Sequence, residues 1–91
     1  MLLSEMDIEN NLSSLDGWGQ AGLEIEKQYK FKNFIESVGF VNKVAILAEK
    51  ADHHPDILIQ YSKVKISLST HSEGGITDKD FSLAGEIEAV S

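Results

Sequence analysis

All three histidines of this protein lie in two short segments, His53-His54-Pro55 and His71. An imidazole titrates at about pH 6.5, so it can donate or accept a proton near neutral pH. The chain has no cysteine, which excludes thiol catalysis and thiolate metal sites. The sequence therefore predicts general acid–base chemistry wherever the fold brings these histidines together.

Two other interpretations of the histidines stay open at this point. Histidines in an exposed loop commonly have no chemical role, although here every histidine of the chain falls in one predicted patch. A metal ion would need further ligands, which four acidic residues could supply: Asp52, Asp56, Glu73 and Asp80. Adjacent residues in an extended segment point to opposite faces, so His53 and His54 would rarely bind one ion together. We favour acid–base chemistry and expect no metal.

A predicted β-hairpin brings the two histidine segments together. Apolar residues alternate with polar ones from 57 to 61 and again from 64 to 68, and Ser62-Lys63 is the natural turn between them. Extended in the same register, this hairpin places His54 directly opposite His71, at the spacing of a cross-strand pair.

A loop one residue longer or shorter would instead bring His53 or Pro55 opposite His71. In either register two distant histidines converge. The apolar residues of the hairpin, with Tyr61 among them, are predicted to face the core. The opposite, polar face then carries His54, Asp56, Ser69 and His71.

Helices and two further strands are predicted around this hairpin. The spacing of apolar residues predicts helices from Glu5 to Leu15, from Asn33 to Lys50 and from Thr77 to Val90, each with a capping residue at its start. A strand from Leu23 to Phe31 follows a short first strand near Trp18. The order helix, hairpin, helix, hairpin, helix predicts an α+β fold: a four-stranded antiparallel sheet with three helices packed on one face.

Size and charge narrow the class of function. A length of 91 residues predicts a single domain over residues 1–91. Eight basic against fifteen acidic residues give a formal charge of −7, which disfavours binding to nucleic acid or to anionic lipid. The longest apolar run, Val44 to Ala48, is far short of a membrane span. We expect a cytoplasmic protein with no membrane or nucleic-acid partner.

Asp80 has two interpretations of its own. It is the third residue after Thr77, the position from which a carboxylate closes a helical capping box. It could equally belong to the histidine cluster. The sequence does not choose between a structural and a site role.

Several spaced residues resemble the pterin-4a-carbinolamine dehydratase family. The family pattern asks for an acid four residues before His-His-Pro, an aromatic residue six after the proline, a histidine ten further on and an aspartate nine beyond that. This sequence meets each requirement, with Glu49, His53-His54-Pro55, Tyr61, His71 and Asp80. The resemblance spans roughly residues 12 to 90. Asn33 stands where the family commonly has an aspartate.

The resemblance implies a function and a set of site residues. The implied reaction is dehydration of a 4a-hydroxytetrahydropterin to quinonoid dihydropterin, in recycling of tetrahydrobiopterin, without a metal or cofactor. His53 and His71 would be the acid–base pair, and His54 would orient the pterin. The supporting residues would be Glu49, Pro55, Asp56, Ser69, Thr70 and Asp80.

The resemblance also leaves alternatives. Some family members are coactivators that bind a homeodomain transcription factor, which would add a nuclear location, and a role in molybdopterin metabolism has been suggested for relatives. Members are commonly dimers or tetramers. Phe40, Ile46 and Leu47 lie off the main apolar stripe of the long helix, so we expect a second apolar face there that serves self-association as a homodimer or homotetramer.

Overall fold

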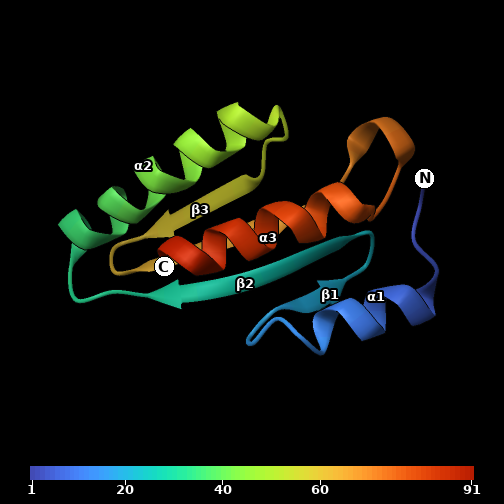
Figure 1. The fold of residues 1–91 in the computed structure, drawn as a ribbon. Coiled ribbons are helices and arrows are strands. Elements are labelled where there is room, and N and C mark those ends of the chain that lie inside the picture. The colour runs from blue at the N-terminus through green and yellow to red at the C-terminus, as the bar shows by residue number, and fades with distance from the viewer.

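The computed structural model describes residues 1–91, and Figure 1 shows the order of their elements. The helices and strands are α1 (Glu5–Leu12), β1 (Gly19–Ala21), β2 (Glu24–Lys30), α2 (Phe34–Ala51), β3 (Asp56–Gln60), β4 (Lys63–Leu68) and α3 (Asp78–Val90). A short 3₁₀-helix, η1 (His71–Glu73), lies between β4 and α3. The predicted order of three helices and four strands is confirmed.

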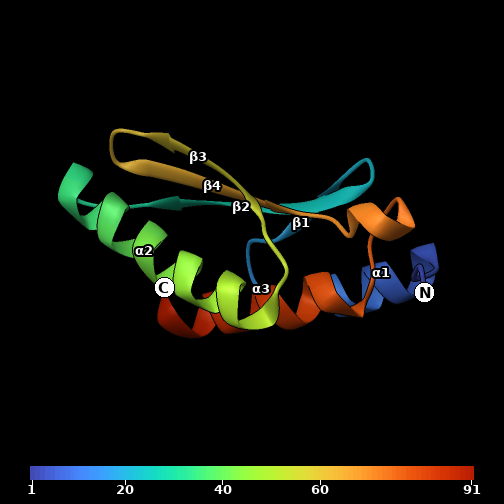
Figure 2. The ribbon, with the colours of Figure 1, turned by 90° about the horizontal axis from the view of Figure 1, so that it is seen from above.

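The strands form one sheet in the order β1-β2-β4-β3, and every neighbouring pair is antiparallel. Figure 2 shows the three α-helices on one side of this sheet, while its other side stays uncovered. The predicted α+β fold is therefore confirmed. None of the helices is both long and apolar enough to cross a membrane.

The turn between β3 and β4 is shifted by one residue from its predicted place. Ile57 pairs with Ile66, so the two turn residues are Tyr61-Ser62 instead of Ser62-Lys63. Tyr61 adopts a left-handed φ of 56°, as a two-residue hairpin turn requires. Its side chain is consequently 68% exposed, and the prediction that it faces the core is wrong.

The predicted pairing of His54 with His71 is also wrong. The β3–β4 ladder begins only at Asp56, which pairs with Ser67. Beyond Leu68 the chain leaves the sheet and forms η1, which begins at His71. Because the ladder ends before it reaches either histidine, tertiary contacts and not strand pairing decide where they lie.

The predicted helix starts are confirmed by their caps. The side chains of Ser4, Asn33 and Thr77 accept backbone N–H groups of the first turns of α1, α2 and α3, which satisfies donors that have no partner within the helix. The largest difference is at the end of α1, which ends at Leu12 and not at Leu15, whereas the ends of α2 and β2 differ from the predicted ones by a single residue.

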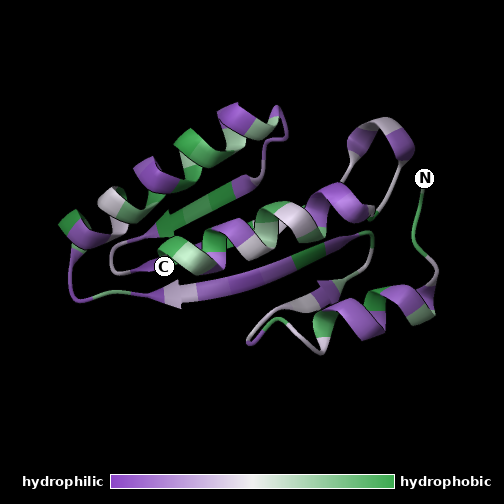
Figure 3. Cartoon of the chain, in the orientation of Figure 1, coloured by the Kyte–Doolittle hydropathy of each residue, from purple (hydrophilic) through white to green (hydrophobic).

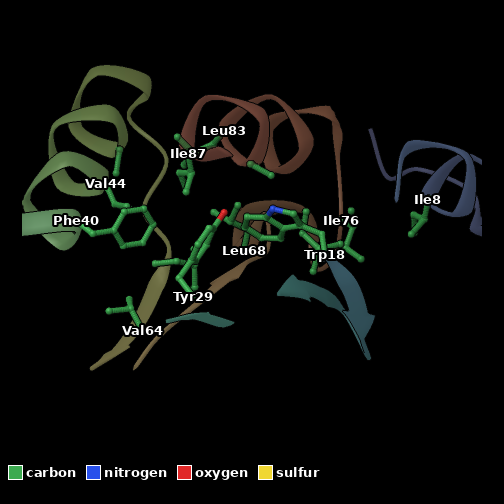
Figure 4. Close-up of a cluster of buried hydrophobic side chains, with 14 residues drawn as sticks. Ile8, Trp18, Tyr29, Phe40, Val44, Val64, Leu68, Ile76, Leu83 and Ile87 are labelled. Atoms are coloured by element: carbon green, nitrogen blue, oxygen red, sulfur yellow. The ribbon is translucent and has the colours of Figure 1, made fainter. Parts of the chain in front are cut away.

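The core lies between the sheet and the helices. Figure 4 shows Tyr29 of β2 and Phe40 of α2 facing one another in it, with ring centroids 4.7 Å apart. Figure 3 shows hydrophobic residues alternating with hydrophilic ones along α2 and α3, as expected of helices with one buried face. The fourteen buried core residues are Ile8, Trp18, Ile25, Tyr29, Phe40, Val44, Ala48, Val64, Ile66, Leu68, Ile76, Leu83, Ala84 and Ile87.

A polar cluster joins α3 to the sheet at the edge of this core. The Glu88 carboxylate accepts hydrogen bonds from Trp18 Nε1 at 3.1 Å, from Lys27 Nζ at 2.7 Å and from the Tyr29 hydroxyl. All three donors come from the β1–β2 region or the residue just before it. One acidic side chain thus fixes the C-terminal half of α3 over β2.

The cluster changes the pKa of two of its members. Burial, together with the hydrogen bond to Glu88, raises the pKa of Tyr29 well above its ordinary value. Burial by itself would raise the pKa of Glu88, but hydrogen bonds from Lys27, Tyr29 and Trp18 outweigh it and lower the pKa. Folding therefore favours a charged Glu88 beside a neutral Tyr29.

We expect Glu88→Gln to lower the free energy of unfolding by about 2 kcal/mol at pH 7, because it removes the charged acceptor of three donors. The pKa of Glu88 lies below its ordinary value of 4.5 in the folded protein. Its stabilisation is therefore present above that ordinary pKa and is lost as the pH falls through the folded pKa. Urea denaturation at pH 7 and at about pH 3 measures both effects.

Glu86→Gln is the matched control, since Glu86 is an exposed acid on the same helix with no hydrogen-bonded partner. We expect it to change stability by less than about 0.5 kcal/mol at either pH. An equal loss in both variants would show that Glu88 acts only through the net charge of the protein.

Candidate active site

The end of α2 places His53. Asp52 adopts a left-handed φ of 50° at the helix C-cap, and the backbone N–H of His53 donates to the Ala48 carbonyl at 3.1 Å. Pro55 then holds the preceding residue in an extended conformation. The chain reverses direction within these few residues, and the His53 side chain turns toward α3.

His53 contacts the carboxylate of Asp80. Its Nε2 lies 2.6 Å from Asp80 Oδ1. The Asp80 side chain is fully buried and the imidazole is 11% exposed. A carboxylate held at one ring nitrogen fixes the orientation of the ring and decides which nitrogen faces outward.

The second oxygen of Asp80 serves a different purpose. Oδ2 accepts the Thr70 hydroxyl and the backbone N–H of Thr77, each at 2.9 Å. The bond to Thr77 completes the capping box of α3. The capping interpretation of Asp80 is therefore confirmed, and its other oxygen contacts His53.

Thr70 connects this network to the last histidine. It is buried, its hydroxyl lies 2.7 Å from that of Thr77, and it directly precedes His71. Backbone hydrogen bonds between Thr70 and Gly75 close the loop that carries η1. Asp80 thus links the segment of His53 to the segment of His71, although the two histidines are not paired across strands.

His71 itself is exposed and borders a hollow of about 390 Å³. We call it the His71 hollow, and its lining consists of Ala21, Leu23, Glu24, Ser69, His71 and Gly74. The Ser69 hydroxyl donates to the Leu23 carbonyl at 2.8 Å, which holds the end of β4 against the start of β2. The hollow therefore lies beside the β1–β2 turn.

His53 borders a different hollow, of about 290 Å³, between the end of α2 and the first turns of α3. Figure 1 shows the loop after α2, the η1 loop and the start of α3 at the same end of the molecule. The two hollows thus belong to one end of the fold and have no lining residue in common.

The other predicted site residues, Glu49, His54, Pro55 and Asp56, lie outside the Asp80 network. Glu49 contacts His54 through a carboxylate–imidazole pair on the surface, where the His54 side chain is 56% exposed. Pro55 is half-buried and leads into β3. Asp56 is exposed and lies with Glu24 around another hollow on the uncovered face of the sheet, and no histidine lines that hollow.

One feature of the site was missed by the sequence analysis. The His71 hollow takes three of its six lining residues from the β1–β2 hairpin, Ala21, Leu23 and Glu24, which no motif singled out. Only the alternation of β2 placed Glu24 on the polar face of the sheet. No three His, Cys, Asp or Glu side chains are arranged to hold a metal ion.

Asp80→Asn should lower the free energy of unfolding by about 3 kcal/mol. The NH₂ group of the asparagine would replace one carboxylate oxygen, and a hydrogen-bond donor would then face the donors that surround Asp80 in this buried site. Asp78→Asn, two residues earlier in the same first turn, removes an exposed acid and should cost no more than about 1 kcal/mol. Urea denaturation of both variants makes the comparison, and equal losses would contradict the linking role of Asp80.

Comparison with known proteins agrees with this architecture. The family model described as pterin 4 alpha carbinolamine dehydratase matches residues 1–90. A protein of Sulfolobus acidocaldarius, provisionally named pterin-4-alpha-carbinolamine dehydratase, is 47% identical over 99% of both chains.

Two solved structures share the fold. A crystal structure described as transcriptional coactivator/pterin dehydratase from Brucella melitensis has a TM-score of 0.95 and 37% identity, and covers 99% of this chain and 98% of that one. A pterin dehydratase-like protein described as a RuBisCO assembly factor in the alpha-carboxysome has a TM-score of 0.69 and 21% identity, over 81% of this chain and 88% of that one. The second likeness concerns the fold alone. With a family model and close relatives matching over nearly its whole length, the chain belongs to the pterin-4-alpha-carbinolamine dehydratase family.

Proposed function

We propose that this protein dehydrates a 4a-hydroxytetrahydropterin to quinonoid dihydropterin and water. Membership of the family supports the reaction class. The observation that carries the proposal is the Asp80 carboxylate, which holds His53 at 2.6 Å and Thr70, the residue before His71, at 2.9 Å. Two imidazoles on separate segments are thereby tied to one end of the fold.

The reaction needs an acid and a base and nothing else. The C4a–O bond breaks, and the leaving oxygen takes up a proton and departs as water. The N5–H proton is removed, and the electron pair of that bond forms the C4a=N5 double bond. One proton is given and one is taken, and no atom is oxidised or reduced, so the chemistry calls for no redox cofactor. Two histidines can hold these opposite protonation states near neutral pH.

We assign the acid–base pair to His53 and His71. The buried carboxylate beside His53 orients that ring, while the exposed His71 borders a hollow large enough for a bicyclic ring. His54, which is paired with Glu49 at the surface, is assigned to orienting the pterin. Ser69 and Thr70 support the segment of His71.

His53→Ala and His71→Ala should each reduce the rate of dehydration roughly 100-fold or more, because each removes a proton donor or acceptor. His54→Ala should act mainly on KM. The measurement is stopped-flow decay of freshly generated 4a-hydroxytetrahydropterin, with and without the protein. Lys50→Ala is the control, since Lys50 is exposed and hydrogen-bonds to no other side chain.

Full activity in the His71 variant would remove that residue from the mechanism. No acceleration by the folded wild-type protein would contradict the dehydratase proposal itself. In that case a protein-binding role, of the kind named for the Brucella structure, would become the leading hypothesis.

We also propose that the protein is a homo-oligomer that associates through the outer face of α2. Ile35 and Ile46 are 81% and 69% exposed, and their spacing of eleven residues places them on one stripe of the helix. The residues predicted for this face were partly wrong, because Phe40 is buried and Leu47 packs against the core. Exposed isoleucines in a stripe are typical of an association surface.

Ile35→Glu with Ile46→Glu should convert the oligomer to monomer, because two charges would be buried against a second copy. Light scattering after size-exclusion chromatography gives the mass. Met6→Glu is the matched control, since Met6 is 71% exposed on α1. A wild-type protein that is already monomeric would contradict the proposal.

A further inference from the structure

We propose that Glu24 recognises the pyrimidine edge of the pterin, with its carboxylate accepting hydrogen bonds from the 2-amino group and from N3–H. The inference rests on the proposed function, because it names a residue that selects the substrate class of that same site. Glu24 belongs to neither the histidine motif nor the set of residues that the family resemblance marks.

The sheet places Glu24 at the border of the His71 hollow, which meets the hollow beside Asp56 at this residue. On one side Glu24 pairs with Ala21 of β1. On the other side the β2–β4 ladder pairs Ile25 with Leu68, so the next step of the same register sets Glu24 beside Ser69. All three residues line the hollow together with His71. Glu24 is therefore held on a strand, and its position does not depend on a loop.

Four acidic residues are buried or half-buried, Glu24, Glu26, Asp80 and Glu88, and of these only Glu24 has no partner. Its side chain is half-buried, yet it forms no hydrogen bond or ion pair within the chain. By contrast, Asp80 holds His53, Glu88 holds Lys27, and Glu26, the next acid on the same face of β2, lies 3.9 Å from Lys65. The carboxylate of Glu24 is free to accept two hydrogen bonds from a ligand.

The lining of the hollow complements a pterin. Glu24 is the only carboxylate among its six lining residues, and a carboxylate matches two parallel N–H donors. Leu23 is 70% exposed at the same place and offers apolar surface to a flat ring. The Ser69 hydroxyl already donates to the Leu23 carbonyl. Glu24 is therefore the side chain that can accept hydrogen bonds from the pyrimidine edge of the ligand.

This orientation also brings the reacting atom to the histidine. In the pyrimidine ring C4a lies directly opposite C2, which carries the amino group. When Glu24 holds the 2-amino group and N3–H, C4a and the adjacent N5 point away from Glu24 across the hollow that His71 borders. Recognition at one edge of the ring therefore leaves the other edge for proton transfer.

The test compares binding of two unreactive ligands, pterin and lumazine, to the wild-type protein and to Glu24→Gln. Lumazine has an oxo group in place of the 2-amino group, so it offers Glu24 an acceptor where pterin offers a donor. We expect the wild type to bind pterin at least about 10-fold more tightly than lumazine, by equilibrium dialysis with fluorescence detection of the ligand. Glu24→Gln should weaken pterin binding by about 10- to 100-fold and remove the preference.

Glu26→Gln is the matched control, since it removes the neighbouring acid of the same strand face, and it should keep the preference for pterin. Loss of the preference in Glu24→Gln alone supports the inference. A Kd for pterin within about twofold of wild type in Glu24→Gln, or a wild type that binds both ligands equally, would overturn it. Because neither ligand reacts, this result is independent of the stopped-flow test, which decides the dehydratase reaction separately.

Discussion

The buried carboxylate of Asp80 is the interaction on which this end of the molecule depends. A charged group with no exposed surface is tolerated only when each of its oxygens has hydrogen-bonded partners. Asp80 obtains them from His53, Thr70 and the start of α3. The requirement to satisfy one charge thus joins the loop after α2 to the segment from Thr70 to Asp80, and the candidate site is built where they meet.

A second carboxylate, that of Glu88, has the corresponding role farther along α3. It fixes the helix to β2 through three donors, so that α3 is held by an acid in its first turn and by another near its end. Between them lie the apolar contacts of Leu83, Ala84 and Ile87 with the core. Because α3 is held at both ends, its first turn is a rigid support for His53. The acid–base role that we propose for His53 requires a ring held in this way.

The acidic residues of this protein divide into those that stabilise the fold and one that we assign to binding the ligand. Acids that have partners within the chain, such as Asp80 and Glu88, are committed to the fold. Glu24 is half-buried beside His71 without a partner, and for that reason we assign it to the ligand. Asp56 also has no partner, but it is exposed and borders a hollow that no histidine lines, so we leave it outside the candidate site.

The sequence by itself determined the order of the elements and the helix caps, because periodicity and capping are local properties that a few neighbouring residues decide. Tertiary structure decided the rest. Tyr61 adopts a left-handed φ in the β3–β4 turn, where no glycine in the sequence indicates such a conformation. The β3–β4 ladder ends before it reaches the histidines. Asp80, and not strand pairing, then linked His53 to the segment of His71. Contacts between residues so far apart depend on the packing of α3 against the sheet, which no local pattern encodes.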